Sequence, residues 1–192
     1  MADNLKGLRV AILATDGFEQ SELMKPREAL KAAGAQTDVV SLKGGHIRGW
    51  NHKDWGDEVT VDQVLTDTDA RNYDALVLPG GVINPDLLRI EPAAVAFVKA
   101  FFSAGKPIAA ICHGPWMLIE SGVAKGHRLT SWPSLKTDIT NAGGTWVDEQ
   151  VVVDDILVTS RKPDDIPAFN REIIKLFSQV RHAESEAKGA AG

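Results

Sequence analysis

The stretch GKPIAAICHGP, residues 105–115, decides the fold of this chain. Its first part, residues 107–111, is a short and continuous apolar run, which is typical of a parallel strand that is buried on both faces. The chain then turns at Cys112, His113 and Gly114 and enters a predicted helix that ends near Glu120. A cysteine at the turn between a buried strand and a helix occupies the position of a nucleophile elbow.

Cys112 has two interpretations. A lone cysteine between apolar residues is often a structural core residue. A core cysteine has no reason to occupy the turn itself, however, and the amino end of the following helix favours a thiolate through its free N–H groups and its dipole. The sequence therefore favours a functional thiol with a lowered pKa. Adjacent residues that enter a helix project about 100° apart, so the ring of His113 is expected to point away from the sulfur.

Apolar runs and helical patterns alternate along the rest of the chain, which predicts an α/β fold with a mostly parallel sheet and helices on both faces. Pro26 is expected to kink or restart the first helix. Residues 43–57 mix glycine, histidine, tryptophan and charged residues without periodicity, and are interpreted as an excursion from the fold rather than a linker. Strands are expected at residues 9–15, 37–42, 75–78, 107–111, near 129, 146–153 and 156–160. Helices are expected at residues 19–33, 93–104, 114–120, 135–141 and 169–180.

The composition is that of one globular domain. Of the 192 residues, 44% are hydrophobic, which is enough for a single core. Residues 1–182 are expected to form this domain. Residues 183–192 are expected to be a disordered tail, because their small and charged side chains bury little apolar area. With 21 basic against 26 acidic residues, the chain has no basic excess for nucleic acid or anionic lipid, so small molecules or proteins are the expected partners.

The cysteine count and the apolar runs predict a cytoplasmic location. One cysteine makes neither an internal disulfide nor a thiolate zinc cage, which suits a reducing compartment. Residues 1–6 lack the apolar core of a signal peptide, and the longest apolar run is far shorter than the roughly 20 residues of a membrane span. His46, His52 and Asp54 show no established ligand spacing and are interpreted as surface residues. Neither a metal nor another cofactor is therefore expected.

Ligands of an open parallel sheet bind outside the carboxyl ends of its strands, where three predicted loops meet: residues 16–22, 79–85 and 112–114. Glu19 and Glu22 in the first loop share a helix face. One of them is expected to reach the sulfur, with a raised pKa and a hydrogen bond to the thiolate, unless both only complement the helix dipole.

Backbone amides of the second loop are candidate oxyanion donors. The N–H groups of Gly80 and Gly81 could join that of His113 in an oxyanion hole, unless the two glycines only make a turn. Trp116 lies one helical turn beyond Cys112 and is expected near the same cleft.

These motifs resemble the PfpI family of intracellular proteases and protein deglycases of the general stress protein type. That family belongs to the class I glutamine amidotransferase-like superfamily. The resemblance rests on GFEQSEL at residues 17–23, LVLPGG at 76–81 and GKPIAAICHGP at 105–115. It continues through TSW at 130–132, NAG at 141–143, WVDE at 146–149, TSR at 159–161 and DIPAF at 165–169.

The resemblance implies a flavodoxin-like, three-layer sandwich in which Cys112 is the nucleophile and Glu22 hydrogen-bonds its sulfur. Protease members also use the histidine after the cysteine, here His113, with an acidic residue from a neighbouring subunit. Asp86 matches the place of that acid, although the family commonly has glutamate there and residues 82–86 make this stretch one residue longer. A homodimer or larger homo-oligomer is expected, with apolar Val82 and Ile83 buried in the contact unless they fold inward.

Three functions are compatible with these residues. The first is a cofactor-free enzyme that acts on reactive carbonyls, either as a protein or nucleotide deglycase or by glyoxalase-type conversion of α-oxoaldehydes to hydroxy acids. Its partners would be small reactive carbonyls or glycated protein and nucleotide. The second is a cysteine peptidase whose triad is shared across subunits. The third is a redox sensor or holdase in which Cys112 is oxidised and nothing turns over.

Overall fold

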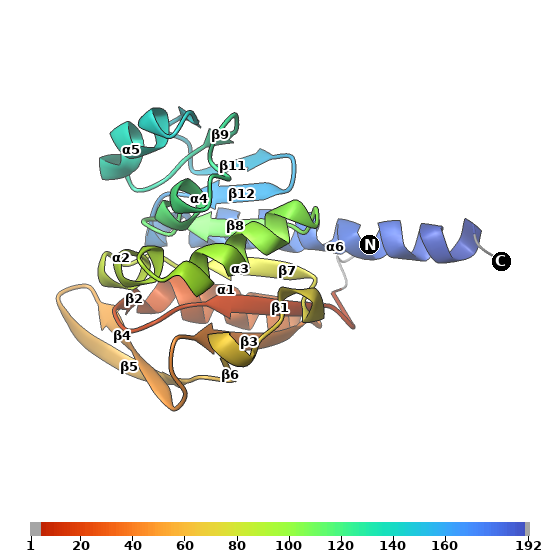
Figure 1. The fold of residues 1–192 in the computed structure, drawn as a ribbon, viewed down its shortest axis with the longest axis horizontal. Helices are drawn as coiled ribbons and strands as arrows, with labels where there is room; N and C mark the ends of the chain where they lie inside the picture. Colours follow the sequence, from red (N-terminus) through yellow and green to blue (C-terminus); the bar gives the residue numbers. More distant parts are fainter. Residues whose placement is uncertain (1–4, 191–192) are drawn as a thin grey trace.

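A seven-stranded sheet lies at the centre of the molecule, in the order β11-β12-β8-β7-β1-β3-β6 (Figure 1). The computed structural model describes residues 5–190. All neighbouring strands of this sheet run parallel except the edge strand β11, which is antiparallel to β12. The strands are β1 (Arg9–Leu13), β3 (Gln36–Ser41), β6 (Gln63–Val64), β7 (Ala75–Leu78), β8 (Ile108–Ile111), β11 (Val151–Asp154) and β12 (Leu157–Ser160).

Helices cover both faces of the sheet, which confirms the predicted three-layer α/β sandwich (Figure 1). On one face α1 and α6 pack together, and α2, α3 and α4 cover the other face, with α5 beside α4. The helices are α1 (Gln20–Ala32), α2 (Ile83–Arg89), α3 (Pro92–Ser103), α4 (Trp116–Glu120), α5 (Lys136–Asn141) and α6 (Ile166–Ala190). Short 3-10 turns occur at η1 (Leu65–Asp67), η2 (Ala70–Asn72), η3 (Pro133–Leu135) and η4 (Pro163–Asp165).

Alternate residues of each central strand belong to different cores. Ile12 and Val77 pack into one apolar cluster, which includes residues of α1 and α6. Leu13 and Leu76 pack into the other, which includes residues of α3 and α4. Strands that are buried on both faces read as continuous apolar runs rather than as alternating ones, which is why the sequence predicts them well.

The order of the parallel strands is that of a flavodoxin-like fold, with β1 at the centre and β3 and β7 on its two sides. The chain leaves β1 toward one side of the sheet and returns to build the other side. Loops after β1, β7 and β8 therefore converge at one edge. None of the helices within residues 5–190 is both long and apolar enough to cross a membrane.

The aperiodic excursion at residues 43–57 contains regular strands outside the central sheet. This region forms the antiparallel hairpin β4 (His46–Asn51) and β5 (Asp54–Thr60), and β4 also pairs with the short strand β2 (Phe18–Glu19). Ile47 and Gly49 are buried, and Gly49 lies against the ring of Phe18. A half-buried strand is recognised by apolar residues at every second position. A glycine at an inward position conceals that alternation, because it carries no apolar side chain. A second small sheet joins β9 (Arg128–Leu129) and β10 (Thr145–Trp146).

Three helices differ from expectation. Helix α1 continues through Pro26 without a restart, because buried Leu23, Pro26 and Leu30 hold it against the sheet despite the lost hydrogen bond. Helix α2 is an addition to the predicted set. Helix α6 extends to Ala190, into the segment 183–192 for which the sequence predicts disorder; alanine, glutamate and lysine there are strong helix formers. The domain boundary at residue 182 stays a prediction, and residues 191–192 lie outside the described chain.

Candidate active site

Cys112 lies directly after β8 with a φ of 63°, in the left-handed region that residues other than glycine rarely adopt. Its N–H donates to the carbonyl oxygen of Ser160 at 3.0 Å, and its carbonyl oxygen accepts from the N–H of Trp132 at 2.9 Å. These two hydrogen bonds hold the strained residue in place. The strand, the strained turn and the short helix α4 make the predicted nucleophile elbow.

Two glycines let the loop after β7 approach its neighbours closely, Gly80 at the elbow and Gly81 at the loop after β1. A Cβ added to Gly80 would lie 2.6 Å from the Cβ of Cys112 and 2.4 Å from Oε2 of Glu22. Gly81 has a φ of +79°, and an added Cβ would lie 2.3 Å from the carbonyl oxygen of Gly17. All three contacts are shorter than real Cβ atoms make, so no larger residue fits at either position without movement of the backbone.

Glu22 is the carboxyl group that reaches the sulfur. It is fully buried on α1, its Oε2 accepts a hydrogen bond from the N–H of Gly80 at 2.9 Å, and it also interacts with Cys112. Burial raises the pKa of Glu22 to about 8, and the nearby charge of Glu19 contributes in the same direction. Glu22 therefore holds its proton near pH 7 and is able to donate a hydrogen bond to a thiolate. The raised pKa expected for a carboxyl beside the thiol is confirmed.

Glu19 has a different environment. It is only partly buried, and its Oε1 accepts a hydrogen bond from Oγ of Ser21 at 3.3 Å. Burial raises its pKa as well, and its charge acts on Glu22. The two carboxyl groups that the sequence could not separate thus have distinct positions, with Glu22 at the sulfur and Glu19 beside it.

The lowered thiol pKa that the sequence predicts is wrong in direction. Burial raises the pKa of Cys112, and negative charge on Glu22 would raise it further, whereas the N–H groups of Gly81 and His113 act in the opposite sense. Helix α4 begins only at Trp116 and is five residues long, so its dipole gives the sulfur little support. Stabilisation of a thiolate depends on the two amides and on the proton of Glu22.

The ring of His113 points toward the sulfur, contrary to expectation. Its Nδ1 lies 3.3 Å from Sγ of Cys112. The expected separation of about 100° assumes helical backbone at both residues, and the positive φ of Cys112 breaks that assumption. Burial lowers the pKa of His113 to about 4, so the ring is neutral near pH 7.

The candidate oxyanion donors are reduced to two. The N–H of Gly80 is engaged with Glu22 and is not available to a substrate, which corrects that part of the expectation. The N–H groups of Gly81 and His113 both interact with the sulfur of Cys112, and that of Gly81 is shared between the sulfur and Glu22, so both face the position where a covalent adduct would form. Their role as oxyanion donors stays a prediction.

Asp86 does not join this group within the chain. It is exposed on α2, and the structure gives it no interaction with His113. Exposed apolar side chains lie on and beside the same helix, and Val82 and Ile83 do not fold inward. These exposed residues are Val82, Ile83, Leu87 and Ile90.

Trp116 lies next to the elbow, as expected, with its ring 5.1 Å from that of His113. Two further residues at the site were not singled out from the sequence. Trp132 stacks on the His113 ring with 6.1 Å between the ring centroids, and Oγ of Ser134 lies 3.5 Å from Nε2 of His113. Both residues lie about 20 positions beyond the elbow, where no local pattern links them to Cys112.

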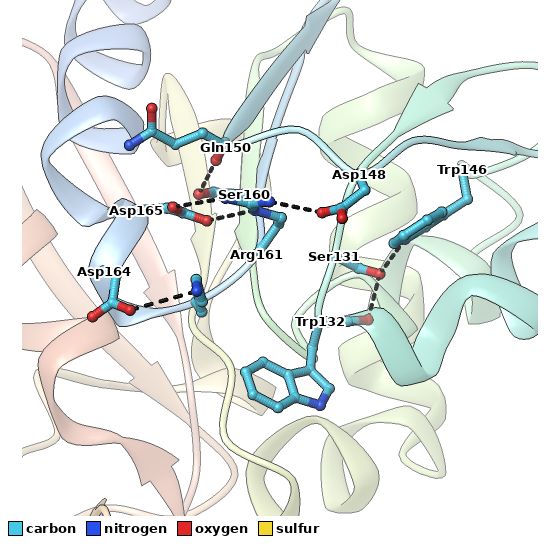
Figure 2. Close-up of polar contacts among 10 residues, drawn as sticks. Ser131, Trp132, Trp146, Asp148, Gln150, Ser160, Arg161, Asp164 and Asp165 are labelled. Atoms are coloured by element: carbon cyan, nitrogen blue, oxygen red, sulfur yellow. Dashed lines mark hydrogen bonds and ion pairs between the residues drawn. The ribbon is translucent and has the colours of Figure 1, made fainter.

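Ion pairs of Arg161 support β12, the strand next to the elbow (Figure 2). Arg161 follows β12 and pairs with Asp148 at 2.7 Å and with the buried Asp165 at 2.8 Å, which joins the loop before β11 to the start of α6. These two carboxylates raise the pKa of Arg161. These ion pairs fix the end of β12, where the carbonyl oxygen of Ser160 accepts a hydrogen bond from the N–H of Cys112.

Glu22 and His113 are expected to make opposite contributions to the dependence of stability on pH. The native pKa of Glu22 is raised from 4.5 to about 8, so the native state binds more protons than the unfolded state between these values, and the free energy of unfolding falls as the pH rises. The native pKa of His113 is lowered from 6.5 to about 4, so its contribution increases with pH and is complete above 6.5. The window from pH 6.5 to 8 therefore isolates Glu22.

In urea unfolding across that window we expect the wild-type protein to lose about 2 kcal/mol of stability that the Glu22→Gln variant does not lose. Glu19→Gln is the matched control, and its free energy of unfolding should still show most of the wild-type decline across this window. Parallel curves for the wild-type protein and Glu22→Gln would show that Glu22 is ionised in the native state.

Residues 5–190 hold no group of three or more His, Cys, Asp or Glu side chains arranged to bind a metal ion. The site consists instead of one thiol, one buried carboxyl group and one neutral imidazole at the carboxyl edge of a flavodoxin-like sheet. This arrangement defines the class of α/β proteins that carry a cysteine at a nucleophile elbow.

Within that class, the chain belongs to the DJ-1/PfpI family, whose model matches residues 8–176. General stress protein 18 of Bacillus subtilis is 44% identical over 175 residues, which are 90% of this chain and 99% of that protein. Protein/nucleic acid deglycase 2 of Escherichia coli is 42% identical over 171 residues, which are 88% and 97% of the two chains. The crystal structure of Drosophila melanogaster DJ-1beta superposes with a TM-score of 0.81 at 28% identity and covers 96% of this chain and 97% of that one. The family resemblance seen in the sequence is confirmed.

Proposed function

We propose that this protein is a cysteine-dependent stress-response enzyme that acts on reactive carbonyls, as a deglycase or as a glyoxalase-type enzyme. The observation that carries the proposal is the position of the Cys112 thiol between a protonated Glu22 and a neutral His113. A relative named as a deglycase of protein and nucleic acid supports the substrate class. Glycated protein, glycated nucleotide and the free α-oxoaldehyde share the carbonyl carbon that a thiolate attacks.

The reaction on methylglyoxal needs no external oxidant. The sulfur of Cys112 bonds to the aldehyde carbon, and the carbonyl electron pair moves to its oxygen, which faces the N–H groups of Gly81 and His113. A proton then leaves the aldehyde carbon and another is added to the neighbouring carbon, with Glu22 or His113 as carrier. The first carbon is oxidised to a thioester while its neighbour is reduced to an alcohol, and water releases lactate and the free thiol.

The single arrangement that favours a second function is the contact of 3.3 Å between Sγ of Cys112 and Nδ1 of His113, a pair that cysteine peptidases also use. In a peptidase the acid of the triad would be Asp86 of a second copy. Asp86 is exposed beside apolar Val82, Ile83 and Leu87, which a homodimer or larger assembly would bury.

Parallel assays of one preparation separate these functions. We expect NMR to show lactate formed from methylglyoxal, and mass spectrometry to show removal of early methylglyoxal adducts from a lysine- and arginine-containing peptide, with no cleavage of labelled casein. Peptide cleavage that is lost in Asp86→Ala, while lactate formation is kept, would establish a separate peptidase activity. An inert protein in all three assays, with Cys112 convertible to a sulfinate, would overturn the proposal in favour of the redox sensor.

A further inference from the structure

The ring of His113 contacts the rings of two tryptophans. Trp132 stacks on it with an angle of 24° between the planes, and Trp116 meets it edge-on at 65°. Trp116 is itself fixed, because its Nε1 donates to Oδ2 of Asp138 at 2.9 Å and the guanidinium group of Arg89 covers its ring at 5.1 Å. These contacts restrict rotation of the imidazole ring, and each of its nitrogens has one polar neighbour.

The segment that carries Trp132 and Ser134 is attached to the elbow itself. The N–H of Trp132 donates to the carbonyl oxygen of Cys112, and Leu135 at the end of the same turn is fully buried. Ser131 adds a side-chain anchor, since its Oγ donates to the carbonyl oxygen of Trp132 at 2.8 Å and accepts from Nε1 of Trp146 at 3.0 Å (Figure 2). The backbone of the segment that carries Ser134 is thus anchored at the elbow, and the Ser134 side chain itself is exposed.

The two ring nitrogens have different partners. Nδ1 lies 3.3 Å from Sγ of Cys112, and Nε2 lies 3.5 Å from Oγ of Ser134. Because the ring is neutral near pH 7, it carries one proton, on one nitrogen or the other. If that proton is on Nδ1, the ring is unable to accept the thiol proton. If it is on Nε2, the lone pair of Nδ1 faces the thiol.

We propose that Ser134 is a positioning residue that accepts a hydrogen bond from Nε2–H of His113 and so directs the lone pair of Nδ1 toward Cys112. Glu22 is protonated near pH 7 and is not free to take the thiol proton, which leaves His113 as its acceptor. The S–H bond of Cys112 breaks as an N–H bond forms at Nδ1, and the imidazolium keeps its Nε2–H hydrogen bond to Ser134. The proton returns to the substrate oxygen or to the leaving group later in the cycle.

This role completes a relay of Cys112, His113 and Ser134 within one chain. It needs no acid from a second copy, because Ser134 of the same chain is the partner of Nε2. The catalytic consequence rests on the proposed function, whereas the position of the ring proton is measurable without any substrate.

The first test is NMR of the protein labelled with ¹⁵N at its histidine rings, with His113→Gln used to assign the signals. We expect the wild-type His113 to be protonated at Nε2, Ser134→Ala to shift population toward Nδ1–H, and Ser134→Thr to restore the wild-type pattern. Ser103→Ala is the matched control, because Ser103 ends α3 at the opposite edge of the sheet and is exposed. An unchanged His113 spectrum in Ser134→Ala, or a shift caused by Asp86→Ala instead, would overturn the proposal.

The second test is the kinetics of lactate formation. We expect kcat of Ser134→Ala to fall about fivefold with KM unchanged, and Ser134→Thr to recover the wild-type value. Equal kcat values for the wild-type protein and Ser134→Ala would contradict the role in catalysis. If the wild-type protein neither forms lactate nor removes methylglyoxal adducts from the peptide, the proposed function fails, while the NMR result still decides whether Ser134 sets the tautomer.

Discussion

Replacement of Cys112 by serine should lower kcat/KM for methylglyoxal by at least about 10³-fold. A serine hydroxyl ionises far less readily than a thiol, and the site raises the pKa even of the thiol through burial. The neighbouring His113 has its own pKa lowered to about 4, so it takes a proton from a hydroxyl even less readily than from a thiol. An oxygen nucleophile would therefore be protonated throughout the accessible pH range.

The chain contains no other cysteine, so Cys112→Ser removes every thiol. Mass spectrometry of the quenched wild-type reaction should find a lactoyl adduct on Cys112, and none on the variant. Circular dichroism and urea unfolding are the controls, since the oxygen fits the space of the sulfur and the fold should persist. A folded Cys112→Ser protein that keeps more than about a tenth of the wild-type rate would exclude covalent catalysis by this residue.

Gly80→Ala should damage both stability and activity. The added methyl group would lie 2.8 Å from the carbonyl oxygen of Ile111 as well as against Glu22 and Cys112, and the first of these contacts is with backbone. To relieve these steric clashes, the loop after β7 has to move away from the elbow. We expect a loss of about 3 kcal/mol in the free energy of unfolding. Displacement of Glu22 and of the Gly81 amide from the sulfur should lower turnover by about 100-fold.

The matched control is Gly44→Ala. Gly44 is exposed, its φ lies outside the left-handed region, and an added Cβ would approach only a side-chain atom of Val64, at the ordinary distance of 3.5 Å. Urea unfolding and lactate formation should stay close to wild type in this variant. If Gly80→Ala behaved like Gly44→Ala, the tight contact between the two loops would not exist in solution.

Much of the fold was predictable because its strands are local apolar runs. The predicted strand at residues 75–78 matches β7 in full, and that at 107–111 differs from β8 by one residue. The hairpin of β4 and β5 was not predictable in this way, since its inward positions include Gly49 and its pairing with β2 comes from a distant segment. Helix α2 has seven residues and includes Pro85, which leaves little periodic pattern to read.

At the site, the sequence by itself determined that Cys112 stands at the turn after a buried strand, and that Glu22 and the two glycines belong to loops at the same sheet edge. The carboxyl ends of parallel strands lie at the same edge of the sheet, so the loops that follow them lie together whichever side chains they carry. Only the tertiary structure decided which carboxyl group reaches the sulfur, which amide Glu22 engages, and where the ring of His113 points. The thiol pKa, the orientation of His113 and the place of Ser134 depend on burial, on one strained φ and on contacts between segments about 20 residues apart. A sequence period records which face of an element is apolar, but it does not record these long-range distances.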